Sequence, residues 1–429
     1  MPCSAVVPPK PEAPARRLAR RLPLCYNVGS KVELAHRMDV TSKPSPPPSP
    51  LPCPVAAGPF AFPPSRRDLF ALVTAALTGD LEGFAPGLTA SRLAALRRHQ
   101  LTPWLYHTTM QRQWATELPP PVLATLRHDY ALSLRAALQQ EREISGVIQA
   151  LAAAGVETTV LKGAELRYRL YGDPGVRTIS DLDLLVSPAA LARAEGALAG
   201  LGYHLYGEHQ LRAAAWQQVG SENIYVPPPP LALLVDLHWE TTSVFHYYRL
   251  PYEPLRQAAL ALDLYGAPVF VLAPEHTLIH LCLEACEDFP RLNLLLDLAV
   301  MLREAPVDWD RFLKAAAQFH CQRPVFLMLS LLSRFLPRQV PPPVMAALAE
   351  YRPTLIELAV LHPRLRYLTL GLPSFWRHRN LQGWLVFIRS DLLPREDQMA
   401  AVYGQAGRGA RLRRAWQKLS AKIFPPQSR

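Results

Sequence analysis

The segment from Asp181 to Val186, with the sequence DLDLLV, constrains the fold more than any other part of the chain. It is almost entirely aliphatic and predicts a buried strand, but it begins with two carboxylates two positions apart. On a strand, the side chains of Asp181 and Asp183 point to the same face, roughly 6–7 Å apart. Two negative charges this close repel each other unless a cation lies between them. The segment therefore predicts a sheet with a cation-binding position on one face.

A third carboxylate lies in a second apolar segment, Leu231 to Trp239, which also reads as a strand. Asp236 would be costly to bury there unless it is paired or bound to a metal. Oxygen ligands of this kind suit Mg²⁺ or Mn²⁺, and three strand-borne acids can place two such ions for phosphoryl transfer. The structural alternative is that Asp181 caps a turn, Asp183 pairs with an arginine, and Asp236 ends an exposed strand.

His238 lies two residues after Asp236 and is expected on the same face of its strand. It either supports a metal-bound carboxylate or contacts the acceptor, or it is simply hydrogen-bonded at the end of the strand.

Lys162 is the only lysine between Lys43 and Lys314 in a chain that otherwise uses arginine. It follows a short β-branched segment, Glu157 to Leu161, that predicts a buried strand. An ammonium group at such a strand end suits a phosphate oxygen, and Gly163 next to it lets a ligand approach the backbone. Arg177 could add a guanidinium to the same phosphate cluster. The alternative is that Lys162 forms a salt bridge to Asp181 or Asp183.

The pattern around these segments predicts a small α/β unit of about 120 residues set between helical segments. Further strands are expected at Asn223 to Val226 and Ala267 to Leu272, and one long helix or two at Val122 to Ala154. The fold class is therefore α+β, with a small mixed sheet and packed helices. The expected regions are a disordered Pro/Arg-rich arm, an N-terminal helical region, the α/β core, a C-terminal helical region and a basic tail: 1–66, 67–154, 155–273, 274–400 and 401–429.

The net charge of +11 would suggest a nucleic-acid-binding protein if it were spread over the chain, but it lies at the two ends. Residues 1–67 and residues 401–429 each carry +7, which leaves −3 for residues 68–400. The basic ends could contact anionic partners, whereas the central region is not a cationic groove. No apolar run reaches 18 residues, and the arm lacks the apolar core of a secretory signal, so we expect no membrane span and a cytoplasmic location.

Several motifs together resemble the uncharacterised nucleotidyltransferase family of the polymerase-β-like superfamily. They run from the central segments into the later helices: VLKG at 160–163, YGDPGVR at 171–177, SDLDLLV at 180–186, GY at 202–203, VDLHW at 235–239, PEH at 274–276, His280, Arg291 and LDL at 296–298. The resemblance covers roughly residues 68–323 and is most specific in the block 162–186.

The resemblance implies a nucleotidyltransferase core in which Asp181 and Asp183 bind the catalytic metals and Asp236 is the third carboxylate. It also places the helix that carries His280 near the sheet, where His280 could line the active cleft. One departure is that the superfamily's Gly-Ser pair is Gly163-Ala164 here, so no hydroxyl supports the triphosphate.

Two functions follow from these residues and the resemblance. The first is a Mg²⁺- or Mn²⁺-dependent enzyme that transfers a nucleoside monophosphate from an NTP to a hydroxyl on an unknown acceptor, a small molecule, an RNA or a protein. The alternative is a nucleotide-binding or scaffold protein that keeps the fold without turnover.

Overall fold

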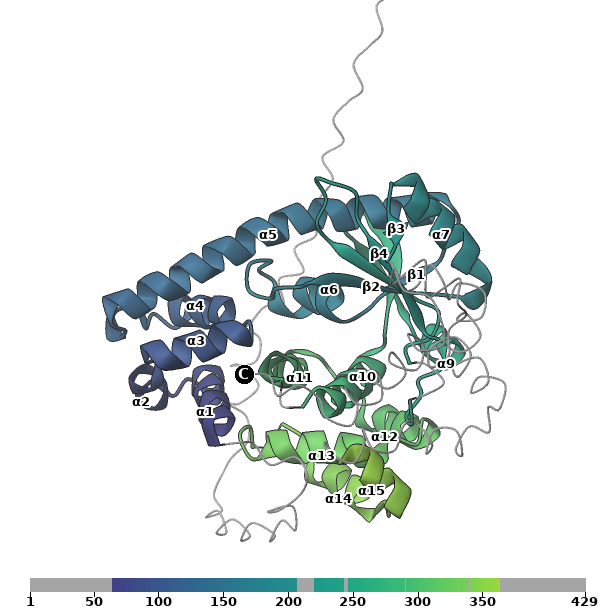
Figure 1. The fold of residues 1–429 in the computed structure, drawn as a ribbon. Helices are drawn as coiled ribbons and strands as arrows, with labels where there is room; N and C mark the ends of the chain where they lie inside the picture. Colours follow the sequence, from purple (N-terminus) through teal and green to yellow (C-terminus); the bar gives the residue numbers. More distant parts are fainter. Residues whose placement is uncertain (1–63, 207–219, 243–245, 290, 338, 363–429) are drawn as a thin grey trace, which may run out of the picture. The chain divides into compact units, whose positions relative to one another are not determined.

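The structure is a computed structural model that describes residues 64–206, 220–242, 246–289, 291–337 and 339–362 (Figure 1). The basic tail expected at 401–429 and all but the last residues of the expected arm lie outside these ranges. Residues 64–66, which were expected in the arm, instead form the first turn of α1, where a proline at the helix start costs no hydrogen bond. The division into five regions stays a prediction.

A mixed sheet of seven strands, in the order β3-β4-β5-β2-β1-β7-β6, forms the centre of the α+β fold. Two neighbouring pairs are parallel, β2 with β5 and β1 with β7, and the remaining pairs are antiparallel. The strands are β1 Thr158–Val160, β2 Asp181–Val186, β3 His204–Leu205, β4 Glu222–Val226, β5 Leu234–His238, β6 Leu260–Leu264 and β7 Ala267–Val271. The mixed sheet that the sequence predicts is confirmed.

The sequence pattern did not predict β3 and β6. β3 has only two residues, too few to show an alternation of apolar and polar side chains. β6 is an edge strand whose residues are mostly exposed, so its apolar residues follow no burial pattern.

Helices precede the sheet in the chain, and the longest of them, α5 (Pro120–Ala153), shows that the segment expected to form one long helix or two forms one. The others are α1 Pro64–Thr78, α2 Leu81–Phe84, α3 Ala90–Arg98 and α4 Thr102–Gln111. The first part of α5 buries Val122 and Leu126 among these helices, and its last part buries Ile144, Ile148 and Leu151 against the sheet. One helix therefore joins the N-terminal helices to the core.

The other described helices lie between strands of the sheet or follow its last strand in the chain (Figure 1). Between strands lie α6 Lys162–Leu166, continued by a π-helical turn at Arg167–Tyr171, then α7 Leu191–Gly200 and α9 Tyr252–Gln257. After the sheet come α10 Pro274–Glu287, α11 Leu292–Glu304, α12 Trp309–Gln318, α13 Gln322–Ser333, α14 Pro342–Glu350 and α15 Leu355–Leu361. Among the described residues, no helix is both long and apolar enough to cross a membrane.

Alternation along β2 decides where the polar residues of the sheet lie. Leu182, Leu184 and Val186 belong to the apolar core that the sheet shares with α5 and α7. The alternate position Leu185 belongs instead to the core that contains α10 and α11. Asp181 and Asp183 share the face of Leu185, because side chains two positions apart point the same way. The carboxylates therefore face α10 and α11, away from α5.

Candidate active site

Two carboxylates meet on the face of the sheet that α10 covers. Asp183 on β2 is the register partner of Asp236 on β5, and Leu185 is the partner of His238. One ligand atom each from Asp183, Asp236 and His238 lie within 4.8 Å of one another. The parallel pairing of β2 with β5 thus places Asp236 and His238 beside Asp183.

Asp181 shares the face of Asp183 but is not part of this group of three close ligand atoms. It begins β2 and is half-buried, whereas Asp183 is buried. Burial raises the pKa of Asp181, and the neighbouring charge of Asp183 raises it further. Asp181 lines the same cavity as Asp183 and Asp236, so all three predicted acids open onto one space.

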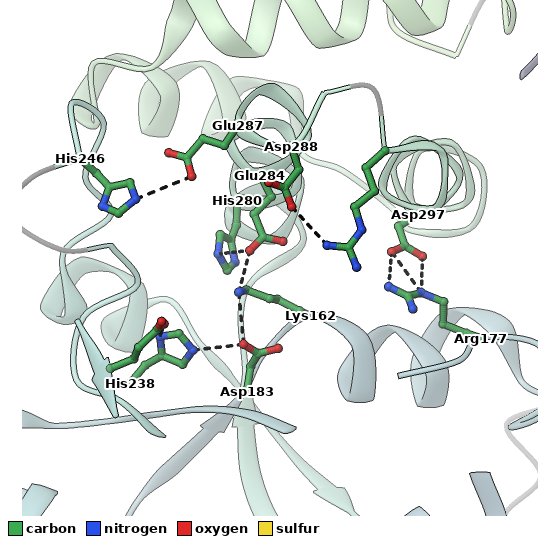
Figure 2. Close-up of polar contacts among 12 residues, drawn as sticks. Lys162, Arg177, Asp183, His238, His246, His280, Glu284, Glu287, Asp288 and Asp297 are labelled. Carbon is green, nitrogen blue, oxygen red and sulfur yellow. Dashed lines mark hydrogen bonds and ion pairs between the residues drawn. The ribbon is translucent and has the colours of Figure 1, made fainter. Parts of the chain in front are cut away.

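The side chains of Lys162 and His238 contact the carboxylate of Asp183 (Figure 2). Its Oδ1 lies 3.2 Å from Lys162 Nζ and 3.1 Å from His238 Nε2. Burial alone would raise the pKa of Asp183, but Lys162 and His238 together hold it well below its usual range. The predicted alternative for Lys162, a salt bridge to one of the strand acids, is thus present in the structure.

His238 lies between two carboxylates. Its Nε2 faces Asp183, and its Nδ1 lies 3.0 Å from Oε2 of Glu222 on β4. Burial would lower the pKa of His238, but the hydrogen bond to Asp183 and the charge of Glu222 raise it above its ordinary value. Sequence reasoning missed Glu222, which reaches the site because β4 pairs with β5 so that Glu222 is opposite His238.

Asp236 has the opposite environment. Its Oδ1 is buried and has no hydrogen-bond partner, and its pKa is raised to about 7, first by burial and then by the charge of Asp183. A buried carboxylate oxygen without a donor is costly unless a proton or a metal ion neutralises it. Together with Asp183, which supplies a second hard oxygen, Asp236 fits the ligand set of Mg²⁺ or Mn²⁺.

Lys162 lies at the turn between β1 and α6, in a left-handed backbone conformation with a φ of 49°. Its Nζ lies 2.6 Å from Oε1 of Glu284 on α10, in addition to its contact with Asp183. Although burial opposes its charge, Asp183 and Glu284 raise the pKa of Lys162 well above its ordinary value. Lys162 therefore connects the sheet to α10 as a permanent cation.

Gly163 follows Lys162 at a place where a side chain would not fit. A Cβ at this position would lie 2.7 Å from Cγ2 of Ile179, which is closer than such contacts allow. Close packing of α6 against the segment that leads into β2 therefore requires glycine here. Gly163 also lines the cavity, as the sequence predicts.

Arg177 opens onto the cavity but is bound to an acid of the C-terminal helices (Figure 2). Its Nε and Nη2 donate to the two carboxylate oxygens of Asp297 on α11, at 2.9 and 2.8 Å. Tyr171 donates a further hydrogen bond of 2.6 Å to the same carboxylate, which is fully buried. Burial opposes the charge of Arg177, and Asp297 offsets this by raising its pKa. The sequence did not single out Asp297 as a partner of Arg177.

His280 on α10 is buried beside this cluster, with its Nε2 3.8 Å from Oε1 of Glu284. Burial lowers the pKa of His280 to about 4, so the imidazole is neutral at physiological pH. Glu284 was missed by sequence reasoning, because one glutamate on an amphipathic helix carries no signal of its own. Only the packing of α10 against the sheet brings it to Lys162.

The cavity between the sheet and the helices has a volume of about 240 Å³. Acids and cations both line it, among them Lys162, Arg177, Asp181, Asp183, Asp236 and Arg291. Acids on one wall suit divalent cations, and lysine and arginine suit phosphate oxygens. The sheet is mixed, and a pair of carboxylates on two adjacent parallel strands faces this cavity. This arrangement agrees with the nucleotidyltransferase type of fold that the sequence motifs suggest.

Comparison with known proteins assigns the chain to one family within this class. Residues 90–337, more than half of the chain, match the model of a family described as "Uncharacterised nucleotidyltransferase". The chain belongs to this family, and the resemblance stated from its motifs is confirmed. A search among curated proteins gives no match.

Solved structures of two proteins show weak similarity. The solution structure of the antibiotic-resistance factor ANT(2'')-Ia is 13% identical, with 46% of this chain and 93% of that chain covered and a TM-score of 0.29. The crystal structure of an antigenic nucleotidyltransferase-like protein from Paracoccidioides brasiliensis is 16% identical, with 51% and 95% covered and a TM-score of 0.29. Neither similarity is high enough to define the fold by itself.

Proposed function

We propose that this protein is a metal-dependent nucleotidyltransferase that transfers a nucleoside monophosphate from an NTP to a hydroxyl acceptor. The observation that carries the proposal is the pair Asp183 and Asp236, in register on parallel strands, with a buried and unpartnered oxygen on Asp236. Family membership supports nucleotidyl transfer in general. The use of a divalent ion, of an NTP as the donor and of a hydroxyl as the acceptor belongs to the proposal.

In this proposal Asp181, Asp183 and Asp236 hold Mg²⁺ or Mn²⁺. When bound, the ions would stabilise the charge that develops on the transferred phosphoryl group and the leaving pyrophosphate. Asp236 would help to bind an ion near the attacking hydroxyl, and the ion would favour deprotonation of that hydroxyl. His238 orients Asp183 through its Nε2 contact.

Lys162 and Arg177 neutralise the triphosphate in this proposal, and Gly163 leaves room for it beside the turn after β1. Both cations are held by helices outside the sheet, through Glu284 and Asp297. Because these side chains are fixed before substrate arrives, little ordering is needed when phosphate binds. The cavity they share with the acids is large enough for the phosphate groups of one nucleotide.

A second candidate is a nucleotide-binding protein without turnover. It is favoured by the state of Asp183, whose Oδ1 already contacts Lys162 and His238. Ala164 also stands where the superfamily has a serine hydroxyl. The cytoplasmic location stays a prediction of the sequence.

One experiment separates the two functions. Binding of each NTP to the full chain is measured with and without Mg²⁺ or Mn²⁺, and pyrophosphate release is then followed with total RNA, protein and small hydroxyl compounds as acceptors. Metal-dependent binding with release, both lost in Asp236→Asn, supports the enzyme. Binding without release on any acceptor supports the second candidate, and absence of NTP binding contradicts both.

A further inference from the structure

A second cavity of about 430 Å³ lies among α1, α4, α11 and the π-helical turn at Arg167–Tyr171. The three helices are labelled in Figure 1. It is distinct from the cavity of the candidate active site, and the proposed reaction uses none of its charged groups. Its polar lining includes His107, Gln111, Arg112, Tyr171, Arg303 and one acid, Glu304.

Two guanidinium groups converge in this cavity on one backbone oxygen. Arg112 Nη2 donates to the carbonyl of Leu77 at 2.8 Å, and Arg303 Nη1 donates to the same carbonyl at 3.0 Å. The two nitrogen atoms therefore lie within about 6 Å of each other. Leu77 is in the last turn of α1, where carbonyl groups lack partners within the helix. The carbonyl oxygen can accept both hydrogen bonds, and each guanidinium keeps further N–H groups that this contact does not use.

The positive charge of this pair is only partly balanced. Arg303 Nη2 donates to Glu304 at 3.0 Å, but the side chain of Glu304 is 47% exposed and solvent screens it. Among the residues that the structure describes, no carboxylate forms an ion pair with Arg112, which instead lies 5.3 Å from the ring centre of Trp114. Burial lowers the pKa of Arg112, and Arg303 lowers it further. The site thus has excess positive charge and unused N–H donors.

We infer that this cavity binds the phosphate group of a small phosphorylated molecule, at a site separate from the active site. Planar guanidinium forks match phosphate oxygens with paired hydrogen bonds, and a dianion would neutralise the two charges that repel each other. The volume leaves room for a small organic group attached to the phosphate.

The wall between the two cavities is a hydrogen-bonded unit. Tyr171 lines the second cavity, and its hydroxyl donates to Asp297, which lines the active-site cavity and holds Arg177. Each cavity has its own cations, Arg112 and Arg303 on one side and Lys162 and Arg177 on the other. Substitutions can therefore remove one anion site and leave the other in place.

Inorganic phosphate is the probe for this inference. Its binding to the full chain is measured by isothermal titration calorimetry against chloride of equal ionic strength, for the wild type, Arg303→Gln and Arg112→Gln. Loss of a charged hydrogen bond is expected to weaken phosphate binding about tenfold in each variant. Lys162→Met removes a cation of the active site, and Arg311→Gln removes an exposed arginine of α12 that pairs with Asp308. Both should keep wild-type affinity for the phosphate bound at the second cavity.

The melting temperature of each variant shows whether it is folded. If Arg112→Gln does not fold, Arg303→Gln still decides the question, because its side chain is 38% exposed and its loss should be tolerated. Unchanged phosphate affinity in Arg303→Gln, binding no tighter than that of chloride, or loss of binding only in Lys162→Met would each overturn the inference.

Discussion

Asp183 and Asp236 are register partners on the parallel strands β2 and β5, yet their carboxylates have opposite electrostatic environments. Lys162 and His238 hold the pKa of Asp183 well below its usual range, against the effect of burial. Burial and the charge of Asp183 raise the pKa of Asp236 to about 7. One acid is thus stabilised as an anion by the protein itself, and the other needs a proton or a metal ion.

This contrast predicts opposite effects of two matched substitutions on stability. A carboxyl whose pKa is raised by folding adds stability below its unfolded pKa and loses it as the pH rises through about 7. At pH 8 with a chelator, Asp236→Asn should therefore unfold with a free energy about 1–2 kcal/mol higher than that of the wild type. Denaturant unfolding monitored by circular dichroism measures this difference.

Asp183→Asn is the counterpart. A carboxyl whose pKa is lowered by folding adds stability above its unfolded pKa, so the substitution should cost about 3 kcal/mol at pH 8, since it leaves Lys162 and His238 without a shared anion. Mg²⁺ or Mn²⁺ should raise the melting temperature of the wild type and have little effect on Asp236→Asn. Two substitutions that destabilise equally would argue against the opposite environments of the two acids.

Lys162 is expected to act both in folding and in phosphate binding. Lys162→Met leaves Asp183 and Glu284 without their shared cation, so the melting temperature should fall. The affinity for NTP, measured on the folded fraction, should also fall by about 1–3 kcal/mol if the ammonium contacts phosphate. Titration of a fluorescent NTP analogue gives the second quantity.

Lys162→Arg refines this prediction, because it keeps the charge in a larger and differently shaped group. An ion pair should survive this change better than a close phosphate contact, so we expect near-normal stability with weaker NTP binding. Normal NTP affinity in both Lys162 variants would show that Lys162 has a structural role and does not contact phosphate.

Asp297 is expected to position Arg177 for the candidate site. Asp297→Asn would leave a buried guanidinium without its partner, at a cost of about 3–5 kcal/mol in the free energy of unfolding. The milder Tyr171→Phe removes only one hydrogen bond to the same carboxylate and should cost about 1 kcal/mol. If Arg177 binds phosphate, Tyr171→Phe should raise KM for NTP more than it lowers kcat.

Asp288→Asn provides the control for Asp297. It breaks an Arg–Asp pair with Arg291, but both side chains are about half exposed, so its unfolding free energy should change by less than about 1 kcal/mol. An equal loss in Asp288→Asn and Asp297→Asn would show that burial of the Arg177 pair has no special effect.

His280 predicts a loss of stability in acid. A histidine whose pKa is lowered by folding stabilises the folded state while it is neutral, and this contribution is lost as the pH falls from about 6.5 towards 4. Across this range His280 binds a proton in the unfolded chain but not while it is buried in the folded protein. The free energy of unfolding of the wild type should therefore fall by about 3 kcal/mol. His280→Gln should flatten the dependence of the unfolding free energy on pH between 6.5 and 4, and an unchanged slope would contradict the burial of a neutral imidazole.

Local patterns in the sequence identified much of the candidate site. Alternation on β2 placed Asp181 and Asp183 on one face, because the side-chain period of a strand is two residues whatever surrounds it. The same pattern placed Asp236 and His238 together on β5, and the rarity of lysine drew attention to Lys162. These are properties of short segments, and they persist in any fold that contains the strands.

Contacts between distant segments were beyond the reach of such patterns. Nothing in the sequence stated that Glu284 would meet Lys162, or that Asp297 would bind Arg177 across 120 positions of the chain. Nothing in the sequence of either helix distinguishes the acid that reaches the site, and its partner is set by how α10 and α11 pack against the sheet.

The sequence by itself therefore singled out Asp181, Asp183, Asp236 and Lys162 as candidate residues and determined which of the acids share a strand face. Tertiary structure decided that Asp183 and Asp236 stand side by side, through the parallel register of β2 and β5. It also decided their charge states, because the pKa of a buried carboxyl depends on the cations that other segments bring within a few ångströms. Asp183 contacts Lys162 and His238, whereas Oδ1 of Asp236 is buried without a hydrogen-bond partner.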